Sequence, residues 1–573
     1  MVKRINRTIA FIGLACFVIT QSAVGQRNLS TSYKAMVSTV RPEATDAAVR
    51  VLQQGGNAVD AAITAAFTLS VVDGYNSGIG GGCFILIRTP DGKLLAIDGR
   101  EMAPRAAKPD MYLRDGRPIP GASEVGPLAS GVPGAVAAYE MAWQIAGRKP
   151  WSDLLGDAIT YAVEGFTIPE KYAERIRSKS RLLSQFSGSR EVLFDSDDEP
   201  RKAGTKLVQT DLGKTLAGIQ AFGSKYFYRG PPAVLISRWM EHNGGILALR
   251  DFRRYRPISR TPVISTFRGY TVVGFPPPSS GGVHVAQMLN ILEQYDLKTI
   301  YGQNPNDFRH VVIESMKLAF ADRAYWLGDP KYAKVPLGLV SKEYARKLSA
   351  KIDLNKANTV LSHGTPALDD TKIFDRHTTH ITAVDAEGFW VAITATVNTS
   401  FGSKVIVPGT GVVLNNEMDD FSIAPGVPNA FGLIGSEANE VVAFKRPLSS
   451  MSPTIILKDG QPVMTLGAAG GPRIITNALL GAIRVLDLGM SPEEAIGEKR
   501  FHHQWSPNKV YLESGTDGMI AESLRKRGHT VLIGGSTGTT QMIYRDPSTG
   551  LLTGVHDPRV PGKADGPREH ASQ

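Results

Sequence analysis

Two adjacent threonines, Thr378 and Thr379, begin a stretch of alternating apolar and polar residues in the second half of the chain. A threonine hydroxyl is a poor nucleophile unless a base takes its proton, and no His/Asp pair at a nucleophile elbow accompanies this one. One known solution is a threonine that becomes the N-terminus of a new chain, so that its own α-amine acts as the base. These residues alone leave a simpler interpretation open, because threonine is also common at the start of a β-strand.

The run from Ile381 to Asn398 predicts a β-hairpin, which would bring another threonine back to the first. If the two alternating segments fold about the turn between them, position 378 lies roughly opposite position 395. Thr396 is then expected beside Thr378. Because side chains alternate along a strand, Thr396 and Asn398 share one face. The open end of the hairpin is therefore predicted to carry a polar face where a reactive hydroxyl could lie.

A glycine-rich turn, Gly467–Arg473, connects a predicted strand to a predicted helix. A strand, a glycine turn and a helix N-terminus together present backbone N–H groups to an anion. Phosphate is one candidate anion, but neither glycine pattern of the nucleotide-binding loops occurs at this turn. An oxyanion hole requires the same geometry for a transient charge.

Charged side chains in two other places could bind a small polar molecule. Arg100 follows a predicted strand and lies close to a glycine-rich turn, where its planar guanidinium group could bind a carboxylate with two hydrogen bonds. The alternative is a surface arginine paired with Glu101. Residues 415–421 contain three carboxylates and two amides.

Four histidines are candidate metal ligands. The candidates are His377, His380, His502 and His503. Their spacing does not match the zinc-protease patterns, and histidines beside aromatic residues are more often hydrogen-bonded packing residues. We therefore expect no metal and no cofactor.

The elements expected to position these residues are a mixture of helices and strands. Helices are predicted over 45–54, 58–72, 135–145, 154–165, 283–295, 311–326 and 474–486, and strands over 83–88, 94–98, 454–458 and 463–466. Segments 185–210 and 350–375 are polar and are predicted to be surface loops. Segment 421–447 is rich in Pro and Gly and is predicted to form a mobile cover over a site.

Composition indicates a globular protein and limits its partners. The chain has 573 residues, of which 42% are hydrophobic and 21% are charged, which is typical of a domain with a sizeable core. The net charge is +10, but the Lys and Arg residues are spread along the chain, so we expect no nucleic-acid partner. Cys83 is the one cysteine outside the predicted leader, which excludes an intramolecular disulfide in the mature chain.

Residues 1–25 have the features of a signal peptide. Basic residues precede the apolar run Ile9–Ile19, and small residues follow at 22–25. The run is too short to span a bilayer, and no later segment has 18 uninterrupted apolar residues. We therefore expect export to the periplasm or the extracellular space, without a stable membrane span.

Several segments, in this order along the chain, resemble the gamma-glutamyltranspeptidase family of N-terminal-nucleophile hydrolases. They are Asp98–Pro104, Thr378–His380, Thr396–Gly402, Asn415–Phe421, Arg446–Pro453, Gly470–Arg473 and Arg500–Trp505. The resemblance implies an α/β fold, a four-layer αββα sandwich built from two self-cleaved chains. Residues 26–377 would form a large subunit and residues 378–573 a small catalytic subunit, joined as a heterodimer.

The resemblance also implies roles for the reacting groups. The precursor would cut itself between His377 and Thr378, after which Thr378 is the nucleophile and its freed α-amine the general base. The backbone N–H groups of Gly470 and Gly471 would bind the tetrahedral oxyanion, and Thr396 would orient the nucleophilic hydroxyl.

The implied substrate is glutathione or another γ-glutamyl compound, held at both charges of its glutamyl α-carbon. The residues implied to bind these charges are Arg100, Ser449 and Ser450 for the α-carboxylate, and Asn398, Glu417 and Asp420 for the α-ammonium. Transfer of the glutamyl group to water completes hydrolysis, and transfer to an amino acid or a dipeptide completes transpeptidation.

Two alternatives remain open. One is a related acylase for glutaryl or cephalosporin-type amides, although Glu417 and Asp420 disfavour it because such substrates lack an α-ammonium. The other is an uncleaved, inactive homologue that serves as a secreted binding protein.

Phe431 takes the lid position where bacterial relatives often have tyrosine, so a lid hydroxyl bond to Asn398 is not expected.

Overall fold

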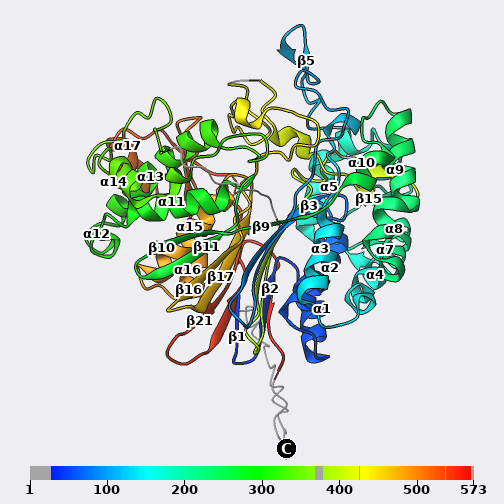
Figure 1. The fold of residues 1–573 in the computed structure, drawn as a ribbon, viewed down its shortest axis with the longest axis horizontal. Coiled ribbons are helices and arrows are strands. Elements are labelled where there is room, and N and C mark those ends of the chain that lie inside the picture. The colour runs from blue at the N-terminus through cyan, green and yellow to red at the C-terminus, as the bar shows by residue number, and fades with distance from the viewer. Residues whose placement is uncertain (1–27, 368–378, 425, 536, 569–573) are drawn as a thin grey trace, which may run out of the picture.

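Two antiparallel seven-stranded sheets form the centre of the computed structural model, which describes residues 28–367, 379–424, 426–535 and 537–568 (Figure 1). The first sheet contains, in spatial order, β1 (Leu29–Ser32), β22 (Leu552–Val555), β21 (Thr539–Arg545), β17 (Gln461–Ala469), β16 (Thr454–Lys458), β11 (Tyr270–Gly274) and β10 (Val263–Phe267). The second contains β23 (Lys563–Asp565), β2 (Met36–Thr39), β12 (His380–Val384), β13 (Trp390–Thr396), β3 (Gly82–Arg88), β4 (Leu94–Gly99) and β9 (Ile258–Arg260).

The two sheets pack face to face through side chains that alternate along their strands. In β3, Phe84 and Leu86 belong to the apolar cluster between the sheets, whereas Ile85 and Ile87 belong to the cluster under the helices. This alternation is the period of two that a strand imposes on its side chains. Both faces of the second sheet are thus buried, which explains why β3 reads as a continuous apolar run.

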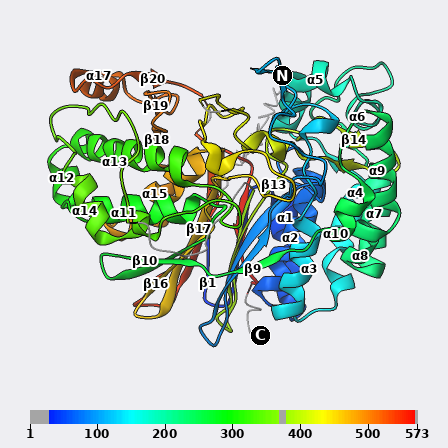
Figure 2. The same ribbon diagram turned by 45° about the horizontal axis from the view of Figure 1, so that its top comes forward.

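Helices cover the outer face of each sheet, as both views show (Figures 1 and 2). On the second sheet lie α1 (Pro42–Gln53), α2 (Ala58–Val72) and α3 (Ala135–Ala146), with α4 (Gly156–Val163), α5 (Glu170–Leu183), α6 (Ser187–Leu193), α7 (Thr210–Phe222), α8 (Ser224–Arg229), α9 (Pro231–His242) and α10 (Leu249–Arg254) beyond them. On the side of the first sheet lie α11 (Gly281–Leu292), α12 (Leu297–Gln303), α13 (Pro305–Trp326), α14 (Lys342–Ser349), α15 (Arg473–Leu486), α16 (Pro492–Gly497) and α17 (Gly518–Lys526). The predicted four-layer αββα sandwich is confirmed.

Short paired strands complete the fold outside the two large sheets. They are β5 (Leu113–Arg114), β6 (Arg117–Pro118), β7 (Phe166–Thr167), β8 (Lys206–Leu207), β14 (Ile406–Val407), β15 (Val412–Val413), β18 (Phe501–His502), β19 (Val510–Leu512) and β20 (Val531–Ile533). No helix within the described ranges is long and apolar enough to cross a membrane.

Segments before and after position 378 share the second sheet. Strands β12 and β13, from the later part of the chain, lie between β2 and β3, from the earlier part. A cut at that position would therefore leave two chains joined by ladder hydrogen bonds on both sides of the hairpin. The predicted signal peptide and the residues His377 and Thr378 lie outside the described residues.

Local sequence signals set most element boundaries. Asn57 caps α2 through a capping box with Asp60, as the sequence predicts for a helix at 58–72. Helix α13 begins earlier than predicted, at Pro305, because Asn304 caps it and proline is favoured in the first turn. The predicted helix at 154–165 is shorter, since a 3₁₀ turn, Trp151–Leu154, precedes α4.

The prediction of a surface loop over residues 185–210 was wrong in part. The short helix α6 forms there, and Leu193 at its end is buried. The helix packs so closely that a Cβ on Gly188 would lie 2.3 Å from the backbone oxygen of Ile406. Packing against a distant segment stabilises this helix, and local periodicity does not reveal such packing.

Candidate active site

In the hairpin β12–β13, Thr396 directly follows Ala395, whose backbone pairs with that of Thr379. His380 lies opposite Thr394, and Thr379 and Ala395 exchange backbone hydrogen bonds, with the Ala395 N–H donating at 2.6 Å. The pairing of Ala395 with Thr379 lies within one residue of the predicted register, which set position 378 opposite roughly position 395. Thr396 is the next residue along β13, and its side chain is buried.

A hydrogen bond fixes the orientation of the Thr396 hydroxyl. Its Oγ1 accepts the backbone N–H of Asn398 at 2.7 Å, and Asn398 has a left-handed backbone with φ of 77°. The Asn398 side chain donates from Nδ2 to the carbonyl of Asn416 at 3.0 Å. Its Oδ1 is buried and accepts no hydrogen bond from any described residue, so it can serve as an acceptor for a bound donor.

The glycine turn after β17 has the backbone of an anion site. Gly470 and Gly471 have φ values of 130° and 60°, and their carbonyls accept from the N–H groups of Arg473 and Ile474 in the first turn of α15. Among the described residues, none accepts a hydrogen bond from the N–H of Gly470 or Gly471. Both amides are thus available to an oxyanion.

Steric contacts exclude other residues from this turn. A Cβ on Gly470 would lie 2.7 Å from Cα of Gly538, and a Cβ on Gly471 would lie 2.8 Å from the ring of Phe431. Such distances are too short for real carbon contacts, and positive φ values favour glycine in any case. The segment that carries Phe431 therefore lies directly against the glycine turn.

Arg100 is fully buried, so the alternative of a surface arginine is wrong. Its Nη1 forms ion pairs with Glu417 and, at 3.4 Å, with Glu101, and its Nη2 pairs with Asp420 at 2.7 Å. Its Nε donates to the Pro447 carbonyl at 3.3 Å. The guanidinium fork and the acidic segment thus meet in one buried cluster.

Burial and mutual repulsion raise the proton affinity of this acidic cluster. Burial raises the pKa of Glu101 to about 7, against the attraction of Arg100. Burial also raises the pKa of Glu417 above its usual range, and the charge of Glu101 adds to the effect. One oxygen of each, Oε1 of Glu101 and Oε2 of Glu417, has no hydrogen-bond partner among the described residues. A cationic group bound here would satisfy these carboxylates.

Neighbouring charges fix the backbone that carries Arg100. Asp98 accepts the Arg100 N–H at 2.9 Å and also pairs with Arg260 at 2.7 Å and with Arg446. Burial alone would raise the pKa of Asp98, but the two arginines lower it below its usual value. No local signal singles out Arg260, because its partner Asp98 lies 162 residues away in the sequence.

Ser449 and Ser450 are buried and follow, a few residues along the chain, a residue that contacts Arg100. Pro447, two residues earlier, supplies the carbonyl that Arg100 contacts. The backbone of Ser449 is fixed by its N–H, which donates to Pro278 at 3.0 Å, and by its carbonyl, which accepts from Ser280. The Ser449 hydroxyl has no partner among the described residues.

The predicted cover, residues 421–447, has little regular structure and lies over one end of the sandwich, yellow in Figure 1. Asn429 donates to Asp420 at 3.1 Å and accepts the Phe431 N–H at 3.0 Å. Gln504 donates to the Phe431 carbonyl at 3.2 Å. These bonds hold the cover against the acidic cluster.

His380, His502 and His503 form hydrogen bonds within the protein. Burial lowers the pKa of His380, His502 and His503 to about 3, so they are neutral. His380 bonds Thr394, and His502 bonds Gln504.

A different group has the spacing of metal ligands. His310, Glu314 and His529 lie close enough to hold an ion, although periodicity gave no sign of it. The carboxylate of Glu314 already binds the buried ammonium of Lys317 at 2.7 Å. Because the Lys317 ammonium already neutralises this carboxylate, Glu314 does not have a free negative charge for a metal ion.

Comparison with known proteins gives consistent matches along the chain. Residues 44–566 match the family described as gamma-glutamyltranspeptidase. A glutathione hydrolase proenzyme of Escherichia coli strain K12 is 41% identical over 529 residues, covering 91% of this chain and 90% of that protein.

Solved structures show the same similarity. A cephalosporin acylase from Bacillus halodurans is 28% identical, with a TM-score of 0.85 over 97% of this chain and 100% of that chain. A gamma-glutamyltranspeptidase from Helicobacter pylori is 38% identical, with a TM-score of 0.54 over 55% of this chain and 90% of that chain.

Proposed function

This chain belongs to the gamma-glutamyltranspeptidase family, and we propose that Thr378 is its nucleophile, with the residues described above as the rest of the site. The chain is a glutathione hydrolase of the gamma-glutamyltransferase enzyme family, because relatives named glutathione hydrolase match most of its length at 35–41% identity and the family model matches residues 44–566. Because two of those relatives are named proenzymes, we propose that this chain is a precursor that cleaves itself into subunits.

The backbone ladder at Thr379 is the observation that carries the proposal. Since Thr379 pairs with Ala395, continuing the register by one residue would set position 378 opposite Thr396. We propose that the Thr396 hydroxyl orients that of Thr378. The cut between His377 and Thr378 would give subunits of residues 26–377 and 378–573, and the shared sheet supports their remaining together as a heterodimer.

The reaction proceeds in two steps. The Thr378 hydroxyl loses its proton to the α-amine of the same residue and attacks the γ-carbonyl of the donor. The N–H groups of Gly470 and Gly471 stabilise the oxyanion. The C–N bond then breaks, the amine leaves with the proton, and a γ-glutamyl ester remains on Thr378.

Water or an amine completes the cycle. Its nucleophilic atom attacks the ester carbonyl carbon, the C–O bond to Thr378 breaks, and its proton returns through the α-amine to the threonine oxygen. Water gives glutamate, and an amino acid or dipeptide gives a new γ-glutamyl amide.

The charges of the buried cluster support recognition of a γ-glutamyl group. Arg100, Ser449 and Ser450 would bind its α-carboxylate, with the unpaired hydroxyl of Ser449 as a donor. Glu417, Asp420 and Asn398 would receive its α-ammonium. Arg100 and the carboxylates of Glu417 and Asp420 compensate one another. A zwitterionic substrate would replace these ion pairs, with its carboxylate on Arg100 and its ammonium on the two carboxylates.

The glutaryl-type acylase is the specific alternative, because a cephalosporin acylase has a very similar fold. A glutaryl group lacks the α-ammonium, so it would leave the carboxylates of Glu417 and Asp420 without a cation. We therefore propose a preference for γ-glutamyl over glutaryl amides. Comparing γ-glutamyl-p-nitroanilide with glutaryl-p-nitroanilide tests it, and equal kcat/KM for the two would refute it.

Replacing Thr378 with alanine tests the nucleophile. The variant is expected to remain one chain of full mature length without activity. A denaturing gel that shows two fragments of the expected sizes in the variant would exclude Thr378. An exported location after removal of residues 1–25 is part of the same proposal and is checked by fractionating cells that express the full chain.

A further inference from the structure

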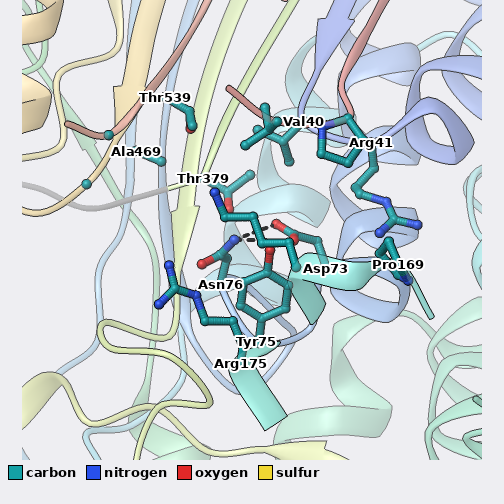
Figure 3. Close-up of a pocket in the computed structure, with 15 residues that line it drawn as sticks. Val40, Arg41, Asp73, Tyr75, Asn76, Pro169, Arg175, Thr379, Ala469 and Thr539 are labelled. Atoms are coloured by element: carbon teal, nitrogen blue, oxygen red, sulfur yellow. Dashed lines mark hydrogen bonds between the residues drawn. The ribbon is translucent and has the colours of Figure 1, made fainter. Parts of the chain in front are cut away.

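A pocket of about 140 Å³ lies beside the proposed oxyanion site and is separate from the glutamyl-binding residues (Figure 3). Gly470 and Thr379 form part of its wall, and none of the residues proposed to bind the glutamyl charges lines it. Figure 3 shows Asp73, Asn76 and Arg175 gathered on one side of Thr379. The pocket therefore extends from the helices on the second sheet to Gly470, one of the proposed oxyanion donors.

Two cations in this pocket have no carboxylate bonded to them. Lys171 and Arg175, one turn apart on α5, line the pocket, are half-buried, and make no side-chain hydrogen bond or ion pair with any described residue. Helix α5 holds both side chains toward the same wall, since residues four apart lie on one face.

The other charged residues of the pocket are already compensated or held. Arg41 pairs with Glu43 through two hydrogen bonds, of which the one from Nε is 3.1 Å long. Asp73 accepts both bonds of the Asn76 amide, at 3.1 and 3.2 Å. With Lys171 and Arg175 set against the single carboxylate of Asp73, the pocket has an excess of positive charge.

The chemistry of the amide indicates what this charge could bind. A γ-glutamyl amide has two parts on either side of the reacting carbonyl, and the cluster around Arg100 is proposed to bind one of them. The amine part must lie on the other side of the same carbon, next to the oxyanion donors. In glutathione this part is cysteinylglycine, a dipeptide that ends in a carboxylate.

We propose that the pocket binds the peptide that leaves in hydrolysis and enters in transfer, and that Lys171 and Arg175 bind its terminal carboxylate. This inference rests on the proposed function and adds a residue-level basis for the acceptor class: short peptides with a free C-terminal carboxylate. The guanidinium group of Arg175 can bind such a carboxylate with two parallel hydrogen bonds, and Lys171 adds a second charge.

The test measures transfer from γ-glutamyl-p-nitroanilide to two acceptors that differ in one charge, glycylglycine and glycylglycine amide. In the wild type the KM for glycylglycine should be the lower one. Lys171→Met and Arg175→Met should each raise it about fivefold, the upper range for a partly exposed charge pair, and should bring it closer to the KM for the amide. Arg175→Lys, which keeps the charge, should restore part of the loss.

Arg177→Met is the matched control, because Arg177 lies on the same helix, is largely exposed and does not line the pocket. It removes the same charge and should leave the KM of both acceptors unchanged. Equal KM values for the two acceptors in the wild type, or an equal rise in the Arg177 variant, would overturn the inference. Absence of p-nitroaniline release from the wild type would instead refute the proposed function.

Discussion

Replacing Arg100 with lysine keeps a positive charge in the buried cluster but removes the planar fork. In the structure the two terminal nitrogens reach different carboxylates, Glu417 and Asp420, and Nε reaches a third acceptor. One ammonium group cannot make the same divided contact, so a bound α-carboxylate would lose at least one charge-assisted hydrogen bond. Such a bond contributes about 1.5–3 kcal/mol, which corresponds to a loss of roughly 10- to 100-fold in kcat/KM.

The assay is hydrolysis of γ-glutamyl-p-nitroanilide, together with the melting temperature of each protein. Arg148→Lys serves as the control, because it makes the same exchange at a surface arginine that pairs with Glu387. Arg100→Met should lose stability as well, since removing the cation leaves buried carboxylates unpaired at a cost of about 3–5 kcal/mol. An unchanged KM in Arg100→Lys would refute the role given to Arg100.

Three further variants or conditions test other parts of the site. Thr396→Val should slow both self-cleavage and turnover. It should also cost about 1–3 kcal/mol of stability, because the Asn398 N–H loses its acceptor. Thr396→Ser keeps the hydroxyl and should be close to wild type in a melting curve and an activity assay. Gly471→Pro should lower kcat at least about 100- to 1,000-fold, because it removes one oxyanion donor and because proline cannot adopt the positive φ of this residue; an unchanged kcat would exclude that amide. Burial raises the pKa of Glu101 to about 7, so the acidic cluster takes up protons as the pH falls through that value. Because a protonated cluster attracts the α-ammonium less, the KM for a γ-glutamyl donor should rise as the pH is lowered from about 8 to about 6. A KM that does not change with pH would contradict this.

Local signals in the sequence were sufficient for the hairpin and for seven helices, α1 to α4, α11, α13 and α15, but not for the other helices of the described residues. The alternation on both sides of residues 385–388 predicted β12 and β13, and Asn57 predicted the start of α2. These features depend on residues close in the sequence, where caps, turns and periodicity act. The four layers followed from the family resemblance, and the packing of the two sheets confirms them.

Contacts between distant segments were not predictable in the same way. Local sequence was also compatible with a surface location for Arg100, because its partners Glu417 and Asp420 lie 317 and 320 residues further along the chain. The basic pocket likewise joins α5 to the glycine turn after β17. Helix α6 was missed because its stability comes from packing against residues more than 200 positions later. Only the folded chain brings such groups together.

Identification of the N-terminus of the smaller fragment in fully active protein is the most direct test of the central claim. Intact-mass analysis combined with N-terminal sequencing should find a new chain that begins at Thr378, and the amount of this chain should rise in step with activity during maturation. Fully active protein in which residues 377 and 378 remain joined would contradict the account, because no free α-amine would then exist to act as the base.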